Sequence, residues 1–505
     1  MSCTKTSRTH KIKLSVITLT LNVMFFSAPL SAATPVTECK YNTFGRTVDG
    51  SNFWNTVGQN ASSVQIAEIN CEIDQFSLNN FLYLVGDDGS GHPRFMSYTP
   101  WYNLFPKKGA PVVSTSYNAL QSTYLNKSAN QEQAGDAFHL LDVNNNTTSY
   151  DLRVNQTFFD YVSSNKIYTK TAMKAQKAAF NKNSAKNGIW LPPTNTDASK
   201  PGAVEIKTSW RDFGDASKNL CPSDIMHCET DAKGNAWGLV GMHLAQKTID
   251  HGELIWATFE HVANSPDCES GSSNPIGKNP VDPMKPGQTI NANKNIPELS
   301  DVTGWSYFNY GSYTTTGGKG NSCPYPGQKN GEQELCLKSP GSAKTSWNQV
   351  NVCRTQALPV VTDSNKVCEQ SMSDSTNLTT VACLNNSLSK SFPSSLATKW
   401  QYYQLVGMEW LFNGLTSAGA VTTGCFTYDE NNGKNACPKY KPGSAPNYGR
   451  SGSTKLANTT METWMQANVY LNKDTSATDC LACHQPQTTT YQGDMSHIFD
   501  RISQD

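Results

Sequence analysis

The chain has 505 residues, and its 41 Lys and Arg balance its 41 Asp and Glu, so the formal net charge at pH 7 is zero. This balance argues against a surface that binds nucleic acid, and the length allows two or three domains or one elaborated domain. Charged residues make up only 16% of the chain, against a usual share of about 25%, which predicts a neutral, polar protein with many loops.

The first 33 residues have the pattern of a secretory signal peptide. Basic residues at 5–13 precede an apolar stretch at 14–26, and small residues follow up to the expected cleavage near Ala32 or Ala33. The alternative is an N-terminal helix of the fold. No later window holds the roughly 18 consecutive apolar residues of a membrane span. We therefore expect a periplasmic or secreted protein with no transmembrane segment in the mature chain.

Residues 34–150 are expected to form an N-terminal region rich in loops, in which 76–85 is one buried strand or a short helix. A core of mixed α and β structure is expected at 151–450. It begins with helical spacing of apolar residues at 152–162 and continues with an Ala- and Lys-rich helix at 172–180.

Four later segments are typical of strands. Residues 203–210 alternate in polarity, 236–247 and 253–262 are separated by a short connection, and 403–411 follows a helix expected around 395–401. The sequence therefore predicts an α+β fold, with an antiparallel sheet flanked by helices. Trp210, Trp237, Trp256, Trp410 and Trp464 fall within these patterned segments, which predicts that they are core residues.

Cysteines are numerous, and after export to an oxidising compartment they are expected to form disulfides. Removal of Cys3 with the leader leaves 14 of the 15 cysteines, and a C-terminal motif uses two of these. The other 12 are expected to form disulfides that tie long loops, including the Pro- and Gly-rich stretch 264–350. The sequence does not determine the connectivity. The simplest pairs are Cys221/Cys228, Cys323/Cys336, Cys425/Cys437 and Cys39/Cys71, with further pairing among Cys268, Cys353, Cys368 and Cys383.

The C-terminal region, 451–505, contains the motif with the clearest chemistry. A helix expected at 456–468 leads to Cys480-Leu-Ala-Cys-His484, which has the C-x-x-C-H spacing for covalent attachment of one c-type haem. Two thiols add to the haem vinyl groups, and the adjacent His484 becomes the proximal iron ligand. The alternatives are a C-x-x-C disulfide or redox pair and half of a zinc site.

Several segments together resemble exported, single-haem cytochrome c family proteins of proteobacteria. The resemblance rests on residues 202–210, 238–248, 253–264 and 456–463 together with the terminal 480–484. It implies a periplasmic c-type haem protein and names no substrate.

The distal side of the iron has several candidate ligands. Met495 and His497 follow His484 by 11 and 13 residues, and His243 and His261 lie on neighbouring expected strands whose pairing could bring them onto one patch. The alternative for both strand histidines is a structural role, with each ring hydrogen-bonded to backbone or to a carboxylate such as Glu260. Because only 21 residues follow His484, we expect the body of the protein, with the His243 strand closest, to cover a weakly ligated or open site.

Three classes of function follow. The first is electron transfer with a redox partner protein. The second is a haem-dependent oxidoreductase or peroxidase that acts on a small molecule at an open distal site, and the ratio of one haem to so long a chain favours it. The third is a disulfide-rich binding protein in which haem is structural or absent.

Overall fold

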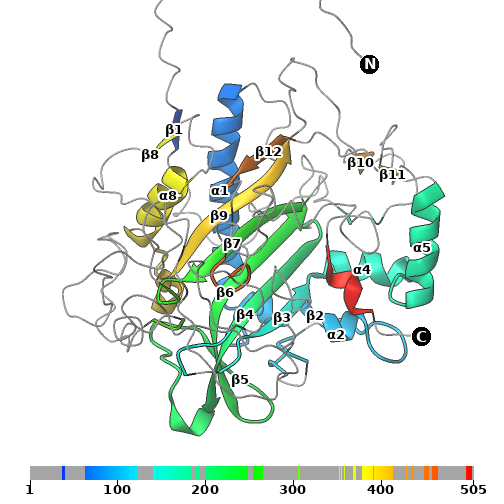
Figure 1. Cartoon of the computed structure of the whole chain (residues 1–505), viewed down its shortest axis with the longest axis horizontal. Helices are drawn as coiled ribbons and strands as arrows, with labels where there is room; N and C mark the ends of the chain where they lie inside the picture. The colour runs from blue at the N-terminus through cyan, green and yellow to red at the C-terminus, as the bar shows by residue number, and fades with distance from the viewer. Residues whose placement is uncertain are drawn as a thin grey trace, which may run out of the picture. The chain divides into compact units, whose positions relative to one another are not determined.

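Eight antiparallel strands form one sheet, which organises the rest of the described structure (Figure 1). Their order across the sheet is β12, β9, β7, β6, β4, β3, β2, and β5 pairs with β6 beside this path. The computed structural model describes residues 37–39, 63–114, 116–121, 124–125, 140–144, 146–182, 189, 191–192, 201–247, 254–265, 305–307, 352, 354, 358, 368–370, 378–390, 392–412, 428–429, 434–435, 449–453, 456, 458–463 and 496–502.

The elements follow one another along the chain with these bounds. The strands are β1 (Thr37–Cys39), β2 (Thr99–Pro100), β3 (Ser149–Val154), β4 (Val204–Asp215), β5 (Cys228–Thr230), β6 (Asn235–Lys247), β7 (Leu254–His261), β8 (Cys368–Gln370), β9 (Tyr403–Phe412), β10 (Tyr428–Asp429), β11 (Lys434–Asn435) and β12 (Gly449–Gly452). The helices are α1 (Ser63–Val85), α2 (Trp101–Leu104), α4 (Gln156–Ser164), α5 (Lys170–Lys182) and α8 (Leu378–Lys390). Short 3-10 helices are η1 (Arg94–Ser97), η2 (Ala216–Lys218), η3 (Thr398–Tyr402) and η5 (Ile498–Arg501).

The α+β class and the antiparallel sheet agree with the sequence prediction. Strands β4, β6, β7 and β9 cover the four predicted segments, and every pairing among them is antiparallel. Helix α5 likewise covers the predicted Ala- and Lys-rich helix. The hydrophobic patterning of these segments was therefore sufficient to identify the central strands.

Three helix predictions differ from the structure. The predicted buried segment 76–85 is the second half of the 23-residue helix α1. Residues 152–154 belong to β3, and the next helix starts only at Gln156, because the Asn155 side chain accepts a hydrogen bond from the backbone N–H of Phe158 and caps that helix. The expected helix near 395–401 is the short 3-10 helix η3.

One face of the sheet carries the largest hydrophobic core. In Figure 1, α1 passes behind β9 and β7 and α8 lies beside it. The Phe81 ring of α1 stacks on Phe259 of β7 with 4.4 Å between the ring centroids. Both rings are fully buried. The predicted N-terminal region therefore contributes α1 to the same core as the strands, within one compact unit, Val36–Asp505.

The opposite face of the sheet is apolar at one side and polar at the other. Near β3 it is apolar, where α2, α4 and η5 enclose a second cluster that includes Phe105, Phe158 and Phe499. Towards β6 and β7, buried polar side chains replace apolar ones. We call the part of this face formed by Glu205, Lys207, Ser209, His243, Thr258 and Glu260 the polar face.

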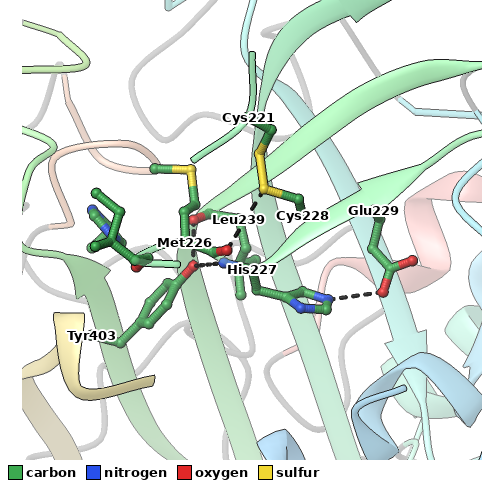
Figure 2. The surroundings of a disulfide bond; sticks show 9 residues. Cys221, Met226, His227, Cys228, Glu229, Leu239 and Tyr403 are labelled. Carbon is green, nitrogen blue, oxygen red and sulfur yellow. Dashed lines mark hydrogen bonds and ion pairs between the residues drawn. A yellow bond between two sulfur atoms is a disulfide. The ribbon is translucent and has the colours of Figure 1, made fainter. Parts of the chain in front are cut away.

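One of the predicted cysteine pairs is confirmed. Cys221 and Cys228 form a disulfide across the connection that precedes β5 (Figure 2), and Cys71 and Cys383 are each disulfide-bonded as well. The other predicted pairs involve residues outside the described ranges or side chains that the structure does not describe.

The remaining predictions about burial also have outcomes. Trp210, Trp237, Trp256 and Trp410 are buried, as predicted for core residues, and Trp464 lies outside the described residues. None of the helices in the described parts of the chain has the length and apolar character needed to cross a membrane.

Candidate functional site on the polar face of the sheet

The polar face holds a turn from the C-terminal region, residues 458–463, which we call the C-terminal turn. Asn458 starts it: its side-chain oxygen accepts hydrogen bonds from the backbone N–H and the hydroxyl of Thr460. Its amide nitrogen donates to Thr258 Oγ1 and to the carbonyl of Phe259, at 2.8 and 3.0 Å. Asn side chains favour such turns because they satisfy nearby backbone groups, and here the same side chain also attaches the turn to β7.

This turn replaces the beginning of the helix predicted at 456–468. Residues 458–463 form a hydrogen-bonded turn, and 464–468 lie outside the described residues. The spacing of Leu456 and Thr460 suggested one face of a helix, yet Thr460 makes polar contacts instead. Competition from the Asn and Thr side chains for backbone groups explains the difference.

Glycines on two strands make room for the C-terminal segment. A Cβ atom at Gly241 would come within 2.5 Å of Thr460 Oγ1 and 2.7 Å of Ser209 Oγ. A Cβ atom at Gly407 would similarly meet the Ser453 side chain at 2.3 Å. The absence of a side chain at Gly241 lets the Thr460 hydroxyl lie 2.7 Å from the Ser209 hydroxyl. The polar face is therefore shaped to receive this segment closely.

The buried carboxylate of Glu260 on β7 is the main acceptor in the contact between the C-terminal turn and the sheet. One carboxylate oxygen accepts from the backbone N–H of Thr459 at 2.6 Å. The other accepts from the Thr459 hydroxyl at 2.8 Å and from Arg354 Nη2 at 2.9 Å. Glu260 and Arg354 are both buried, with 0% and 1% of their side chains exposed. This buried carboxylate has a guanidinium and two further donors as partners, and it fixes the turn to the sheet.

His243 of β6 pairs with Glu462 at the end of the turn. Its Nε2 lies 2.7 Å from Glu462 Oε1, and Glu462 Oε2 accepts from the backbone N–H of Asn458 at 2.9 Å. Burial disfavours the ionised form of Glu462, but the His243 charge, its hydrogen bond, Lys207 and the Asn458 N–H together outweigh burial and lower the pKa of this carboxyl. Glu462 therefore orients the imidazole and closes the turn.

Replacing Glu462 by Gln should lower stability and weaken its dependence on pH. We expect a loss of about 1.5–3 kcal/mol at pH 7, because a charge-assisted hydrogen bond is removed. The wild-type contribution of Glu462 is present above the ordinary Glu pKa of about 4.5 and is lost as pH falls below it, because the folded-state pKa is lowered. Urea unfolding between pH 7 and pH 3 measures both effects. The exposed Glu72→Gln variant is the control, and an equal pH profile for both variants would contradict the role of Glu462.

The end of the chain is attached to the same face. The Ser496 hydroxyl donates to a carboxylate oxygen of Glu205 on β4. Burial raises the pKa of Glu205, opposed by this hydrogen bond and by nearby His497 and Lys207. Directly after it, η5 packs Ile498 and Phe499 into the apolar cluster next to β3. Glu205 pairs with Ala245, two residues from His243 on β6, so the two C-terminal attachments lie on adjacent strands.

The two strand histidines do not form one patch, contrary to the prediction. In the pairing of β6 with β7, His243 lies opposite Thr258, so strand alternation places His261 on the other face. His261 is fully buried, its Nε2 is 2.9 Å from the carbonyl of Ile225, and its Nδ1 accepts from the backbone N–H of Ala263. Burial lowers the pKa of His261 to about 4, ahead of the opposing bond to Ile225. Its role is structural in this arrangement.

The other predicted site residues have different positions. His497 lies next to Glu205 at the start of η5. Cys480, Cys483, His484 and Met495 lie outside the described residues. With Nε2 engaged by Glu462, His243 could offer only Nδ1 as a lone-pair ligand. Within the described ranges, no three His, Cys, Asp or Glu side chains are grouped so as to hold a metal ion.

Sequence reasoning missed Asn458, Glu462 and Arg354, and it assigned Glu260 to a different role. Glu260 was expected as a partner of a strand histidine, whereas the carboxylate that pairs with His243 comes from Glu462, 219 residues away in the chain. The run Asn458-Thr-Thr contains side chains that favour turns, and this signal could have located the turn.

Comparison of the chain with family models, curated proteins and solved structures finds no match.

Proposed function

We propose that this chain is an exported c-type haem protein that transfers electrons, with haem attached to Cys480 and Cys483 and His484 as the proximal iron ligand. The C-x-x-C-H motif is the observation that carries the proposal, because two thiols and an adjacent imidazole are the donor set for covalent haem. The sequence resemblance to exported cytochrome c family proteins and the leader at 1–33 support it.

The attachments on the polar face give a second line of support. The motif begins 17 residues after Thr463 and ends 12 residues before Ser496. Glu462 is held by His243, and Ser496 is held by Glu205. Those two sheet residues are diagonal neighbours on adjacent strands, which places their Cα atoms on the order of 7–8 Å apart. The segment that carries the motif therefore leaves and rejoins the sheet at nearly the same place.

Each residue would have a limited task in this function. Cys480 and Cys483 would hold the group, and His484 would ligate its iron. When bound, haem c supplies a one-electron couple between ferrous and ferric iron. The Glu260, Asn458 and Glu462 contacts fix the start of the segment, and Ser496 with η5 fixes its end, which would limit reorganisation during electron transfer.

A haem-dependent oxidoreductase or peroxidase is the second candidate, and the His243–Glu462 pair favours it. A carboxylate that bonds one imidazole nitrogen sets the tautomer and direction of the ring, as in sites where His handles protons. Exposure of the reduced protein to carbon monoxide separates the candidates. A shifted Soret band would indicate an open sixth position and favour the enzyme, and an unchanged spectrum would favour the carrier.

Paired cysteine substitutions test the proposed haem attachment. Expressed in the periplasm of a bacterium with a c-type haem attachment system, the Cys480→Ser/Cys483→Ser variant should lose all haem stain on a denaturing gel. The matched control, Cys221→Ser/Cys228→Ser, removes a disulfide near β5 and should keep the stain. Wild-type protein without stain would contradict haem attachment and favour a disulfide-rich binding protein.

A further inference from the structure

A second group of titratable side chains lies at the edge of the sheet near β5, and the proposed haem function does not use it. We call His92, Tyr117, His227 and Glu229 the Glu229 cluster. Tyr117 donates its hydroxyl to Glu229 Oε2 at 2.7 Å. The other oxygen, Oε1, lies 2.8 Å from His227 Nε2 and 3.4 Å from His92 Nδ1. One buried carboxylate is thus in contact with two imidazole rings and a phenol hydroxyl.

His227 is the innermost member of the cluster. Figure 2 shows its ring extending towards Glu229, away from the neighbouring disulfide of Cys221 and Cys228. The ring is buried and stacks on Trp400, with 4.9 Å between centroids. Among the described residues, its Nδ1 has no hydrogen-bond partner, and its Nε2 lies within ion-pair distance of Glu229 without the geometry of a hydrogen bond. A protonated ring would therefore hold a buried N–H donor without an acceptor.

Burial and the surrounding charges disfavour the protonated, imidazolium form of His227. Burial, ahead of the opposing Glu229 contact, lowers the pKa of His227, and Lys399 and His92 lower it further. Burial disfavours the ionised form of Glu229, but His227, Tyr117 and His92 outweigh it and lower the pKa of the carboxyl. Burial and Glu229 raise the pKa of Tyr117, and the charge of Arg153 opposes this shift. Among described residues, only the two histidines lie within ion-pair distance of Glu229.

The cluster joins three chain segments that are far apart in sequence. His92 lies within the glycine-containing turn whose ends pair at Asp87 and Pro93, and its side chain is 35% exposed. Tyr117 comes from the irregular segment 116–121 and stacks on His92 with 3.5 Å between ring centroids. His227 and Glu229 belong to the disulfide-closed connection and to β5, which pairs only with β6. Solvent reaches the outer histidine, while the inner one is enclosed.

We propose that the Glu229 cluster is an acid-sensitive latch, in which protonation of His227 releases residues 86–93, 116–121 and 221–230 from the edge of the sheet. In the closed form the imidazole is neutral, with its Nε2 facing Glu229. Opening exposes the ring to water, where an imidazole takes up a proton with its ordinary pKa of about 6.5. The open form therefore binds more protons than the closed form below this pH, and acid favours opening.

Amide hydrogen exchange at pH 7.5, 6.5 and 5.5, read by mass spectrometry of the full chain, tests the latch. After correction for intrinsic exchange rates, protection in the three segments should fall about ten-fold between pH 7.5 and 5.5. Protection in residues 241–247 of β6, which pair with β7 and not with β5, and in β7 should not change. Unchanged protection in the three segments would overturn the proposal, since stacking on Trp400 would then stabilise the charged ring. An equal loss in residues 241–247 of β6 and in β7 would also overturn it by indicating global unfolding.

Matched histidine variants identify the group that titrates. His227→Gln should abolish the pH dependence in the three segments, whereas His92→Gln and His497→Gln should retain it. If His92→Gln abolished it instead, the outer histidine would be the sensor and the proposal for His227 would be wrong. The wild-type pH series needs no variant and stands as a test even if His227→Gln does not fold.

Discussion

Replacing Glu260 by Ala is expected to destabilise the folded chain by about 3–5 kcal/mol, the typical cost of breaking a buried ion pair. The substitution removes the buried carboxylate that pairs with the buried guanidinium of Arg354 and that accepts from the Thr459 backbone N–H and hydroxyl. Urea unfolding at pH 7 measures the loss.

A double variant separates the charge from the packing. Glu260→Leu combined with Arg354→Met removes both charges and should recover part of the stability lost in Glu260→Ala, because no unpaired charge remains buried. The Thr459 donors stay unsatisfied, so recovery should be incomplete. A Glu260→Ala loss below about 1 kcal/mol, the range of exposed ion pairs, would contradict the buried network.

Replacing Phe81 by Ala is expected to cost about 3–5 kcal/mol, as for other fully buried aromatic rings. The ring stacks on Phe259 of β7 and lies near Trp400 and Tyr403, so its removal leaves a cavity between α1 and the sheet. The exposed Val112→Ala variant is the control and should change stability by less than about 0.5 kcal/mol. Equal losses in both variants would indicate that α1 does not pack on the sheet.

The parts of the fold that followed from sequence are those with strong local patterning. The strand at 203–210 was recognised from its alternating polarity, and those at 236–247, 253–262 and 403–411 from short runs rich in apolar and aromatic residues. The Cys221/Cys228 disulfide followed from its short loop. Helix α1 was only half recognised: the prediction covered 76–85, although Ile66, Ile69 and Ile73 in its first half also follow helical spacing.

The candidate site was harder to predict because it depends on contacts between distant segments. His243 was identified, but its partner Glu462 comes from a turn that resembled a helix in sequence. Gly241 lies in the segment 238–248 on which the family resemblance rests, yet only the structure relates it to the close approach of Thr460. The face of the sheet on which the His261 side chain lies depends on the strand register, which the sequence did not specify.

Mass spectrometry of the proteolysed wild-type protein tests the central claim most directly. The protein is purified from a periplasm with a haem attachment system and digested without reduction. The account predicts that the peptide containing Cys480, Cys483 and His484 carries the mass of one covalently bound haem. Recovery of that peptide without haem, as free thiols or as a Cys480–Cys483 disulfide, would contradict the account.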